Sequence, residues 1–283
     1  MKKILVPTDF SPNAKHALHV AATIATETQA QLALMHSNTA VAYTSMPESA
    51  FAGINDPTDY YGIAADEFRL LKKGLTAEPA FSKLEIETRV EEGHLYAAVR
   101  RVVEEEEADL VVMGTKGAHG AAEFFVGSNT EKVIRTVPCP VLAVPESSGT
   151  FELKTVVLAT TLEKDQAAAF RQLAIWQRYW PFKINVLYLN NPGLFASDED
   201  IKKAALAFAI DAGVKNVHTY ISGNTFDEEG TILKFAQKEN ADLIVMATHQ
   251  RKGLSHLLFG SLTEDTVNHS PIPVLSVPVK VVN

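Results

Sequence analysis

The sequence repeats itself once, and this duplication constrains the fold more than any other feature. The run DLVVM at residues 109–113 matches DLIVM at 242–246, and PCPV at 138–141 matches PIPV at 271–274 with the same separation. Near the start of each copy, ILVPTD at 4–9 matches VVLATT at 156–161. Repeats of this length are tandem domains rather than solenoid units. We therefore expect one domain at residues 1–147 and a second at 152–283.

Each copy alternates short apolar runs with helical patterns. In the first copy the apolar runs lie near residues 4–6, 32–35, 84–90, 110–113 and 141–144. A helix is expected after Ser11 and Pro12, since serine favours the N-cap and proline the first helical position. Further helical patterns lie at 64–76, 95–103 and 129–136. This alternation predicts an α/β fold in which two doubly wound parallel sheets are covered by helices on both faces.

The first copy contains a long insertion at residues 37–63. It has no clear periodicity and contains Pro47, Gly53, Pro57 and Gly62. A loop of this length is either disordered or functional, for example as a lid over a site. The sequence leaves both alternatives open.

The composition narrows the function classes. The chain of 283 residues has a formal net charge of -8 and no basic block, which argues against a nucleic-acid surface. No window approaches 18 apolar residues, so no membrane span is expected, and the apolar run at the N-terminus is too short for a signal peptide. The single cysteine, Cys139, rules out an internal disulfide. We expect a soluble cytoplasmic protein.

A glycine-containing stretch follows the fourth apolar run. Gly114 and Gly117 come directly after it, and Gly127 and Ser128 stand before the next helical pattern. Glycine lets a ligand approach the backbone, and the free N–H groups at a helix start favour an anion. Asp9 ends the first apolar run, so its carboxylate should lie at the same edge of the sheet and could accept hydrogen bonds from a ribose or an adenine amine. Together these residues predict a nucleotide site.

A structural explanation exists for part of this pattern. Ser128 and Glu131 form the S-x-x-E spacing of a capping box, which is sufficient to account for a serine there. Ser261 and Glu264 repeat the same spacing in the second copy. From spacing alone, helix capping and nucleotide binding both remain open.

At these residues the chain resembles the universal stress proteins of the UspA type in their tandem two-domain form. Their pattern is G-x2-G-x9-G-S/T after the fourth strand, and here Gly114, Gly117, Gly127 and Ser128 match it. The resemblance implies Rossmann-like five-stranded sheets of order 3-2-1-4-5, similar to adenine nucleotide alpha hydrolases, packed as an intrachain pseudo-dimer through the fifth strands. It also implies that ATP, with or without Mg²⁺, binds at a set of residues in the first domain: Pro7, Thr8, Asp9, Met113, Gly114, Gly117, Gly127, Ser128, Asn129 and Thr130. His36 and Ser37 are further candidates for lining the base pocket.

The second copy departs from this pattern. Ala247 replaces Gly114, Gln250 replaces Gly117 and Thr161 replaces Asp9. The resemblance and this loss together predict one working nucleotide site, in the N-terminal domain. A basic group in the second copy could bind another anion or could be a solvated loop: His249, Arg251, Lys252 and His256.

Three functions are compatible with the sequence. The first is a stress-response protein that binds an adenine nucleotide. The second is a nucleotide-independent interaction or scaffold protein whose partner is unknown. The third, a slow ATPase or phosphotransferase, has little support because the G-x-x-x-x-G-K-[ST] loop is absent and His36, His94 and His119 are isolated. No catalytic or metal-binding residue is expected. The sequence leaves open whether two chains associate.

Overall fold

The computed structural model describes residues 1–38, 58–115, 128–190, 197–223, 227–249 and 258–279. Its strands are β1 Lys3–Pro7, β2 Gln31–Asn38, β3 Ile86–Glu92, β4 Leu110–Gly114, β5 Val141–Val144, β6 Thr155–Thr160, β7 Lys183–Tyr188, β8 Val217–Ile221, β9 Leu243–His249 and β10 Val274–Val279. Its α-helices are α1 Pro12–Thr28, α2 Thr58–Thr76, α3 Leu95–Glu106, α4 Ser128–Thr136, α5 Ala167–Trp176, α6 Asp198–Ala212, α7 Glu228–Lys238 and α8 Leu258–His269. Two 3-10 helices, Pro79–Phe81 and Lys164–Gln166, complete the described elements.

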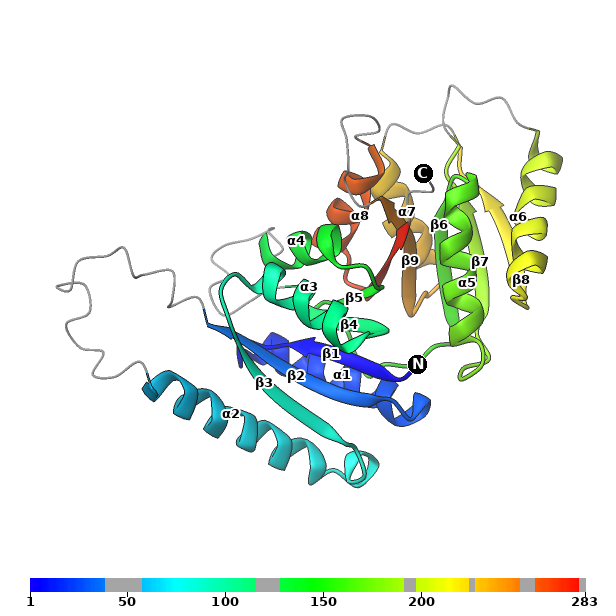
Figure 1. The fold of residues 1–283 in the computed structure, drawn as a ribbon. Helices are drawn as coiled ribbons and strands as arrows, with labels where there is room; N and C mark the ends of the chain where they lie inside the picture. The colour runs from blue at the N-terminus through cyan, green and yellow to red at the C-terminus, as the bar shows by residue number, and fades with distance from the viewer. Residues whose placement is uncertain (39–57, 116–127, 191–196, 224–226, 250–257, 280–283) are drawn as a thin grey trace, which may run out of the picture.

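The strands form one ten-stranded sheet in the order β3-β2-β1-β4-β5-β10-β9-β6-β7-β8 (Figure 1). Each half of this order is the predicted 3-2-1-4-5 arrangement, and all pairs within a half are parallel. The two halves join where β5 and β10 pair antiparallel, with Leu142 opposite Leu275. The predicted pairing of the fifth strands within one chain is therefore confirmed.

Helices cover both faces of this sheet, as predicted. One hydrophobic core lies between the sheet and α1, α2, α5 and α6, and the other lies between the sheet and α3, α4, α7 and α8. Successive strand residues alternate between them, so that Ile4 belongs to the first core and Leu5 to the second. Because both faces are buried, the strands read as continuous apolar runs.

The duplication extends to individual hydrogen bonds. Asp109 Oδ2 accepts from the backbone N–H groups of Lys2 and Lys3 at the start of β1. Asp242 Oδ2 accepts in the same way from Lys154 and Thr155 at the start of β6, at 2.8 Å each. The aspartate that precedes the fourth strand of each copy thus secures the start of the first strand.

Most predicted boundaries agree with the structure, and the expected loop at 37–63 is corrected at both ends. Ser11 caps α1 by accepting from Ala14 N–H, and Pro12 is the first helical residue. Residues 37 and 38, however, belong to β2, and residues 58–63 belong to α2. No proline lies between Thr58 and Ala64, and a glycine in a helix costs only about 1 kcal/mol, so the helix continues through Gly62. Residues 39–57 of the expected loop lie outside the described residues. Over the described residues, no helix is long and apolar enough to cross a membrane.

Candidate functional site

The candidate site lies at the carboxyl ends of β1 and β4, which are parallel neighbours in the sheet. Ligands of parallel α/β sheets bind at this edge, where the strand order reverses. Thr8 follows β1 and is held by a hydrogen bond from its N–H to Met35 O, at 2.8 Å. Pro7 and Thr8 are both buried. The structure therefore brings the end of β1 and Gly114, the last residue of β4, to one edge as predicted.

A tight turn presents Asp9 at this edge. Thr8 Oγ1 accepts from Phe10 N–H at 3.0 Å, and Asp9 Oδ1 accepts from Ser11 N–H at 3.1 Å. Phe10 has a φ of 63°, a left-handed conformation that is uncommon for a bulky residue. The side chain of Asp9 is exposed, so its carboxylate faces solvent at the end of the sheet. The turn orients a negative charge where a ligand hydroxyl or amine could donate to it.

Gly114 lies where α1 approaches β4 closely. A Cβ added at this residue would lie 3.1 Å from the carbonyl oxygen of Asn13 and 3.2 Å from its carbonyl carbon. Contacts this short force the neighbour to move. Helix packing thus accounts for this glycine independently of any ligand, and Asn13 is a residue of this edge that the sequence did not indicate.

The first turn of α4 is tied to the end of β4. Thr130 is buried, and its Oγ1 donates to Gly114 O at 3.1 Å, whereas Asn129 is exposed. Met113 is 5% exposed and packs into the core beside α3 and α4, so little of it can contact a ligand. Ser128 begins α4, but its side chain lies outside the described residues, as do Gly117 and Gly127.

His36 is fixed beside the same turn. Its Nδ1 lies 2.8 Å from Thr8 O, and its ring centroid is 4.8 Å from that of Phe10. The carbonyl oxygen can only accept, so Nδ1 is the donor in this hydrogen bond. The position of His36 at the end of β2 signalled its presence here, but its orientation depends on the turn at Phe10.

The second copy keeps the turn and changes the side chains around it. Thr160 Oγ1 accepts from Leu162 N–H at 3.0 Å, and Leu162 has a φ of 59°. Thr161 occupies the place of Asp9, so the carboxylate is missing. Gln166, in the place of Ala14, is 2% exposed, and its Oε1 accepts from Thr160 Oγ1 at 3.4 Å. At the position of Asp9 the second copy therefore has no carboxylate, and it contains a buried amide, that of Gln166, which the first copy does not have. Of the basic group, Arg251, Lys252, His256 and the His249 side chain lie outside the described residues.

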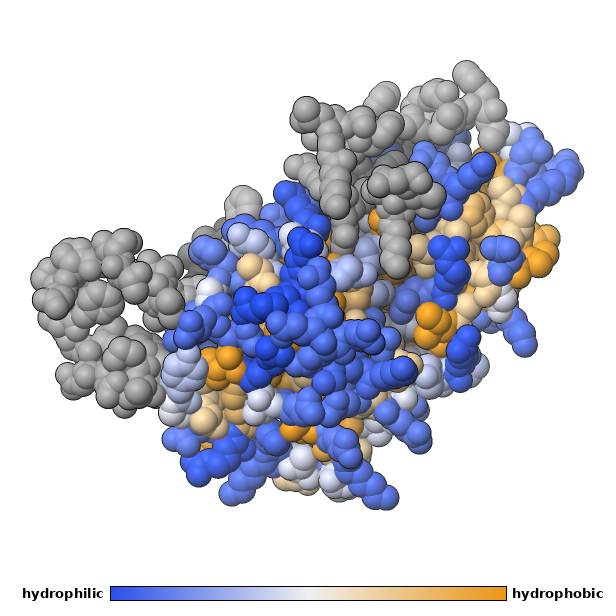
Figure 2. Space-filling model, in the orientation of Figure 1, coloured by the Kyte–Doolittle hydropathy of each residue, from blue (hydrophilic) through white to orange (hydrophobic). Residues whose placement is uncertain are grey.

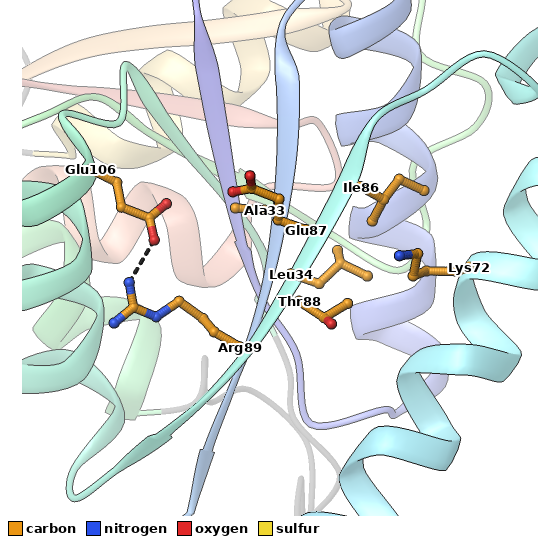
Figure 3. Close-up of a pocket in the computed structure, with 8 residues that line it drawn as sticks. All are labelled: Ala33, Leu34, Lys72, Ile86, Glu87, Thr88, Arg89 and Glu106. Atoms are coloured by element: carbon orange, nitrogen blue, oxygen red, sulfur yellow. Dashed lines mark hydrogen bonds and ion pairs between the residues drawn. The ribbon is translucent and has the colours of Figure 1, made fainter.

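A hollow of about 440 Å³ lies away from this edge, around β3 (Figure 3). Figure 3 shows Lys72 and Ile86 on one side of β3, and Arg89 and Glu106 on the other. Arg89 bonds to Glu106 at 2.5 Å and to Glu91 at 2.6 Å, so its charge is already neutralised. We do not assign the predicted nucleotide site to this hollow, because Glu87, Arg89 and Glu106 are already engaged in ion pairs.

The ion pairs around Arg89 predict a pH dependence of stability. Burial acts to raise the pKa of Glu91 and of Glu106, but hydrogen bonds from Arg101 and Arg89 to Glu91, and from Lys3 and Arg89 to Glu106, outweigh it and hold both pKa values below their usual range. A depressed folded-state pKa contributes stability above the unfolded pKa, and this is lost as pH falls through the folded pKa. Arg89→Met should therefore lower the free energy of unfolding by about 1 to 2 kcal/mol at pH 7. In urea titrations, the difference in unfolding free energy between the natural chain and Arg89→Met should shrink as the pH falls below about 4. A difference that is the same at pH 7 and pH 3 would contradict the assignment.

Comparisons with known proteins agree with this architecture. The sequence model of the Universal stress protein family matches residues 1–145 and 153–278. A universal stress protein of Thermus aquaticus is 33% identical over 148 residues, which cover 50% of this chain and 98% of the relative. One from Methanocaldococcus jannaschii is 31% identical over 144 residues, which cover 50% of this chain and 81% of the relative. Among solved structures, a universal stress protein of Archaeoglobus fulgidus has a TM-score of 0.73 at 17% identity and covers 98% of both chains.

Proposed function

This chain belongs to the universal stress protein family, and we propose that it binds one adenine nucleotide, ATP, in its N-terminal half as part of a cytoplasmic stress response. The observation that carries the proposal is the contrast between two copies of one turn. In both turns a threonine Oγ1, of Thr8 or Thr160, accepts from the N–H two residues later. The residue that donates, Phe10 or Leu162, has a left-handed backbone conformation. Only the first copy places an exposed carboxylate, Asp9, at the turn.

The proposed nucleotide lies across the carboxyl ends of β1 and β4. Asp9 accepts hydrogen bonds from the ribose or the base, and the free N–H groups at the start of α4 receive the phosphates, since a helix N-terminus favours an anion. Gly117 and Gly127 lie outside the described residues and stay in the proposed site on the sequence alone, since glycine permits a close approach to a ligand. Mg²⁺, where present, would accompany the phosphates. In the second half, Gln250 and Thr161 replace a glycine and the aspartate, so we propose no nucleotide there.

Thermal melting with and without Mg-ATP tests this proposal. A single site filled at about 100 times its dissociation constant adds about 2.7 kcal/mol to the stability of the folded state. We expect a rise in melting temperature for the natural chain and for Thr161→Ala, and little or no rise for Asp9→Ala. Thr161→Ala is the matched control, because it alters the equivalent turn of the second copy.

The shifts in melting temperature of the three proteins show whether ATP binds at the proposed site. Absence of a shift in the natural chain, or an equal shift in Asp9→Ala and Thr161→Ala, would refute the proposed site. Mass spectrometry of nucleotide released from the purified protein provides a second measurement. Adenine nucleotide should be released from the natural chain and not from Asp9→Ala.

A further inference from the structure

The two ends of the ten-stranded sheet are β3 and β8, and they differ in the protection of their outer edges. β3 reads IETRVEE and carries Glu87, Arg89, Glu91 and Glu92, several of them in ion pairs. β8 reads VHTYI and carries no Asp, Glu, Lys or Arg. Charged side chains are the usual protection of a sheet edge against pairing with another chain. By this criterion β3 is protected and β8 is not.

The outward-facing backbone groups of β8 follow from its pairing with β7. Ile184 N–H donates to Asn216 O, and Ser222 N–H donates to Tyr188 O, at 2.9 Å each. In a parallel ladder, alternate residues of a strand bond to the same neighbour. Residues 216, 218, 220 and 222 therefore face β7, and Val217, Thr219 and Ile221 direct their N–H and C=O groups away from the sheet. Among the described strands, none lies beyond β8 to receive them.

Apolar side chains accompany this open edge. Leu206 and Ile210, one turn apart on α6, are 57% and 71% exposed. Leu206 also lines a hollow of about 460 Å³ together with Lys202 and residues 217–220 of β8. Figure 2 shows hydrophobic surface at the α6 and β8 end of the molecule, while hydrophilic surface covers most of the opposite half. An unpaired edge next to exposed apolar side chains is typical of an interaction site.

We propose that β8 pairs antiparallel with β8 of a second copy of this chain. A two-fold axis at Thr219 places the two Thr219 residues opposite each other and Val217 opposite Ile221 of the other chain, in the hydrogen-bonded pairs of an antiparallel ladder. These pairs consist of β-branched residues, which favour strands, and bring no like charges together. The contact is isologous and closes as a dimer. The chain already uses this kind of contact internally, where β5 meets β10.

The same two-fold axis brings complementary groups together beside the strands. α6 runs antiparallel to β8 on one face, so the α6 helices of the two copies lie side by side on that face. Their exposed Leu206 and Ile210 side chains then cover one another over the new strand pair. The acidic first turn of α6, Asp198–Asp200, lies at the Ile221 end of β8 and meets the end at which the other copy carries exposed Lys215. Charge and apolar surface thus both favour a second copy over an unrelated strand.

Sedimentation velocity of the full chain over a concentration series tests the proposal. The natural protein should sediment with twice the 30.9 kDa mass of one chain. Thr219→Pro removes an outward N–H without touching the bonds to β7, a position at which proline is tolerated, and should give the monomer. Thr88→Pro is the matched control on β3. The bonds from Leu32 N–H to Glu85 O and from Gly93 N–H to Asn38 O show that the N–H of Thr88 also points outward. This variant should remain a dimer.

A charge exchange keeps the test decisive if the proline variant does not fold. Thr219→Lys and Thr219→Glu place like charges opposite each other in a dimer, so each variant alone should be monomeric. An equimolar mixture of the two should form a dimer again. A natural chain that is monomeric throughout, a dimer that survives both charged variants, or a dimer lost only in Thr88→Pro would each overturn the proposal. Nucleotide binding does not enter these outcomes, so they stand apart from the site at Asp9.

Discussion

Replacing Arg135 with methionine is expected to lower the free energy of unfolding by about 3 kcal/mol, because it leaves a buried carboxylate without its partner. Arg135 lies on α4 of the first half and donates through Nε and Nη2 to the two carboxylate oxygens of Glu264 on α8 of the second half. Glu264 is 4% exposed. The hydrogen bond to Glu264 raises the pKa of Arg135. We take the lower end of the usual range because the side chain of Arg135 is 37% exposed and solvent screens the pair.

Urea denaturation with two further variants separates this effect from the loss of any arginine. Arg100→Met removes an ion pair with Glu104 whose side chains are 57% and 51% exposed, and should cost at most about 0.5 kcal/mol. The double variant Arg135→Met, Glu264→Met should recover most of the loss, since two apolar groups replace the buried pair. Equal small losses for Arg135→Met and Arg100→Met would show that the contact between the two halves contributes nothing.

This ion pair also shows what a sequence pattern cannot reveal. The S-x-x-E spacing predicted Ser261 and Glu264 as a capping box, but α8 begins at Leu258, so Ser261 lies inside the helix and not at its N-cap. The carboxylate of Glu264 instead accepts from Arg135 on the other copy. Spacing within a helix reports only on neighbours along that helix. The partner of Glu264 is decided by the antiparallel pairing of β5 with β10, which brings α4 toward α8. In the first copy the equivalent glutamate, Glu131, lies 4.0 Å from Arg135 on its own helix.

The strand order, in contrast, could be predicted from the sequence. Apolar runs such as residues 4–6 and 110–113 are long enough for buried strands and too short for helices, and parallel strands covered on both faces leave few topologies. Ser11 and Pro12 gave the start of α1 correctly because capping is a local property. Residues 58–63 were misassigned because helix propensity in that segment, which contains Gly62, is weak.

The candidate site was predictable only in part. The position of Asp9 followed from its place at the end of a strand. The packing of Gly114 against Asn13 and the bond between His36 and Thr8 depend on backbone geometry that no local pattern encodes. Gln166 could have been noticed by comparing the copies, since it stands where the first copy has Ala14. Gly117, Gly127 and the side chain of Ser128 remain predictions, because they lie outside the described residues.

Replacing Leu142 with alanine is expected to destabilise the protein by about 3 to 4 kcal/mol, and part of this loss should be shared with Leu275. These two leucines lie opposite each other where β5 meets β10, and both are 0% exposed within one hydrophobic core. Side chains directly opposite in an antiparallel pair are in contact. The losses of Leu142→Ala and Leu275→Ala should therefore not add, and the double variant should reveal a coupling of about 1 kcal/mol.

Leu34→Ala provides the matched control for this coupling. Leu34 lies on β2, is also 0% exposed and belongs to the same core, but three strand pairings separate β2 from β5. Leu34→Ala should lower the free energy of unfolding as much as Leu142→Ala does. The losses of Leu34→Ala and Leu275→Ala should add within about 0.5 kcal/mol in the double variant. Urea titrations of the single and double variants measure both quantities. Coupling that is no larger for Leu142 with Leu275 than for Leu34 with Leu275 would mean that the two halves do not share a core in solution. A coupling confined to Leu142 and Leu275 would establish that the side chains of β5 and β10 are in contact across the junction of the two halves.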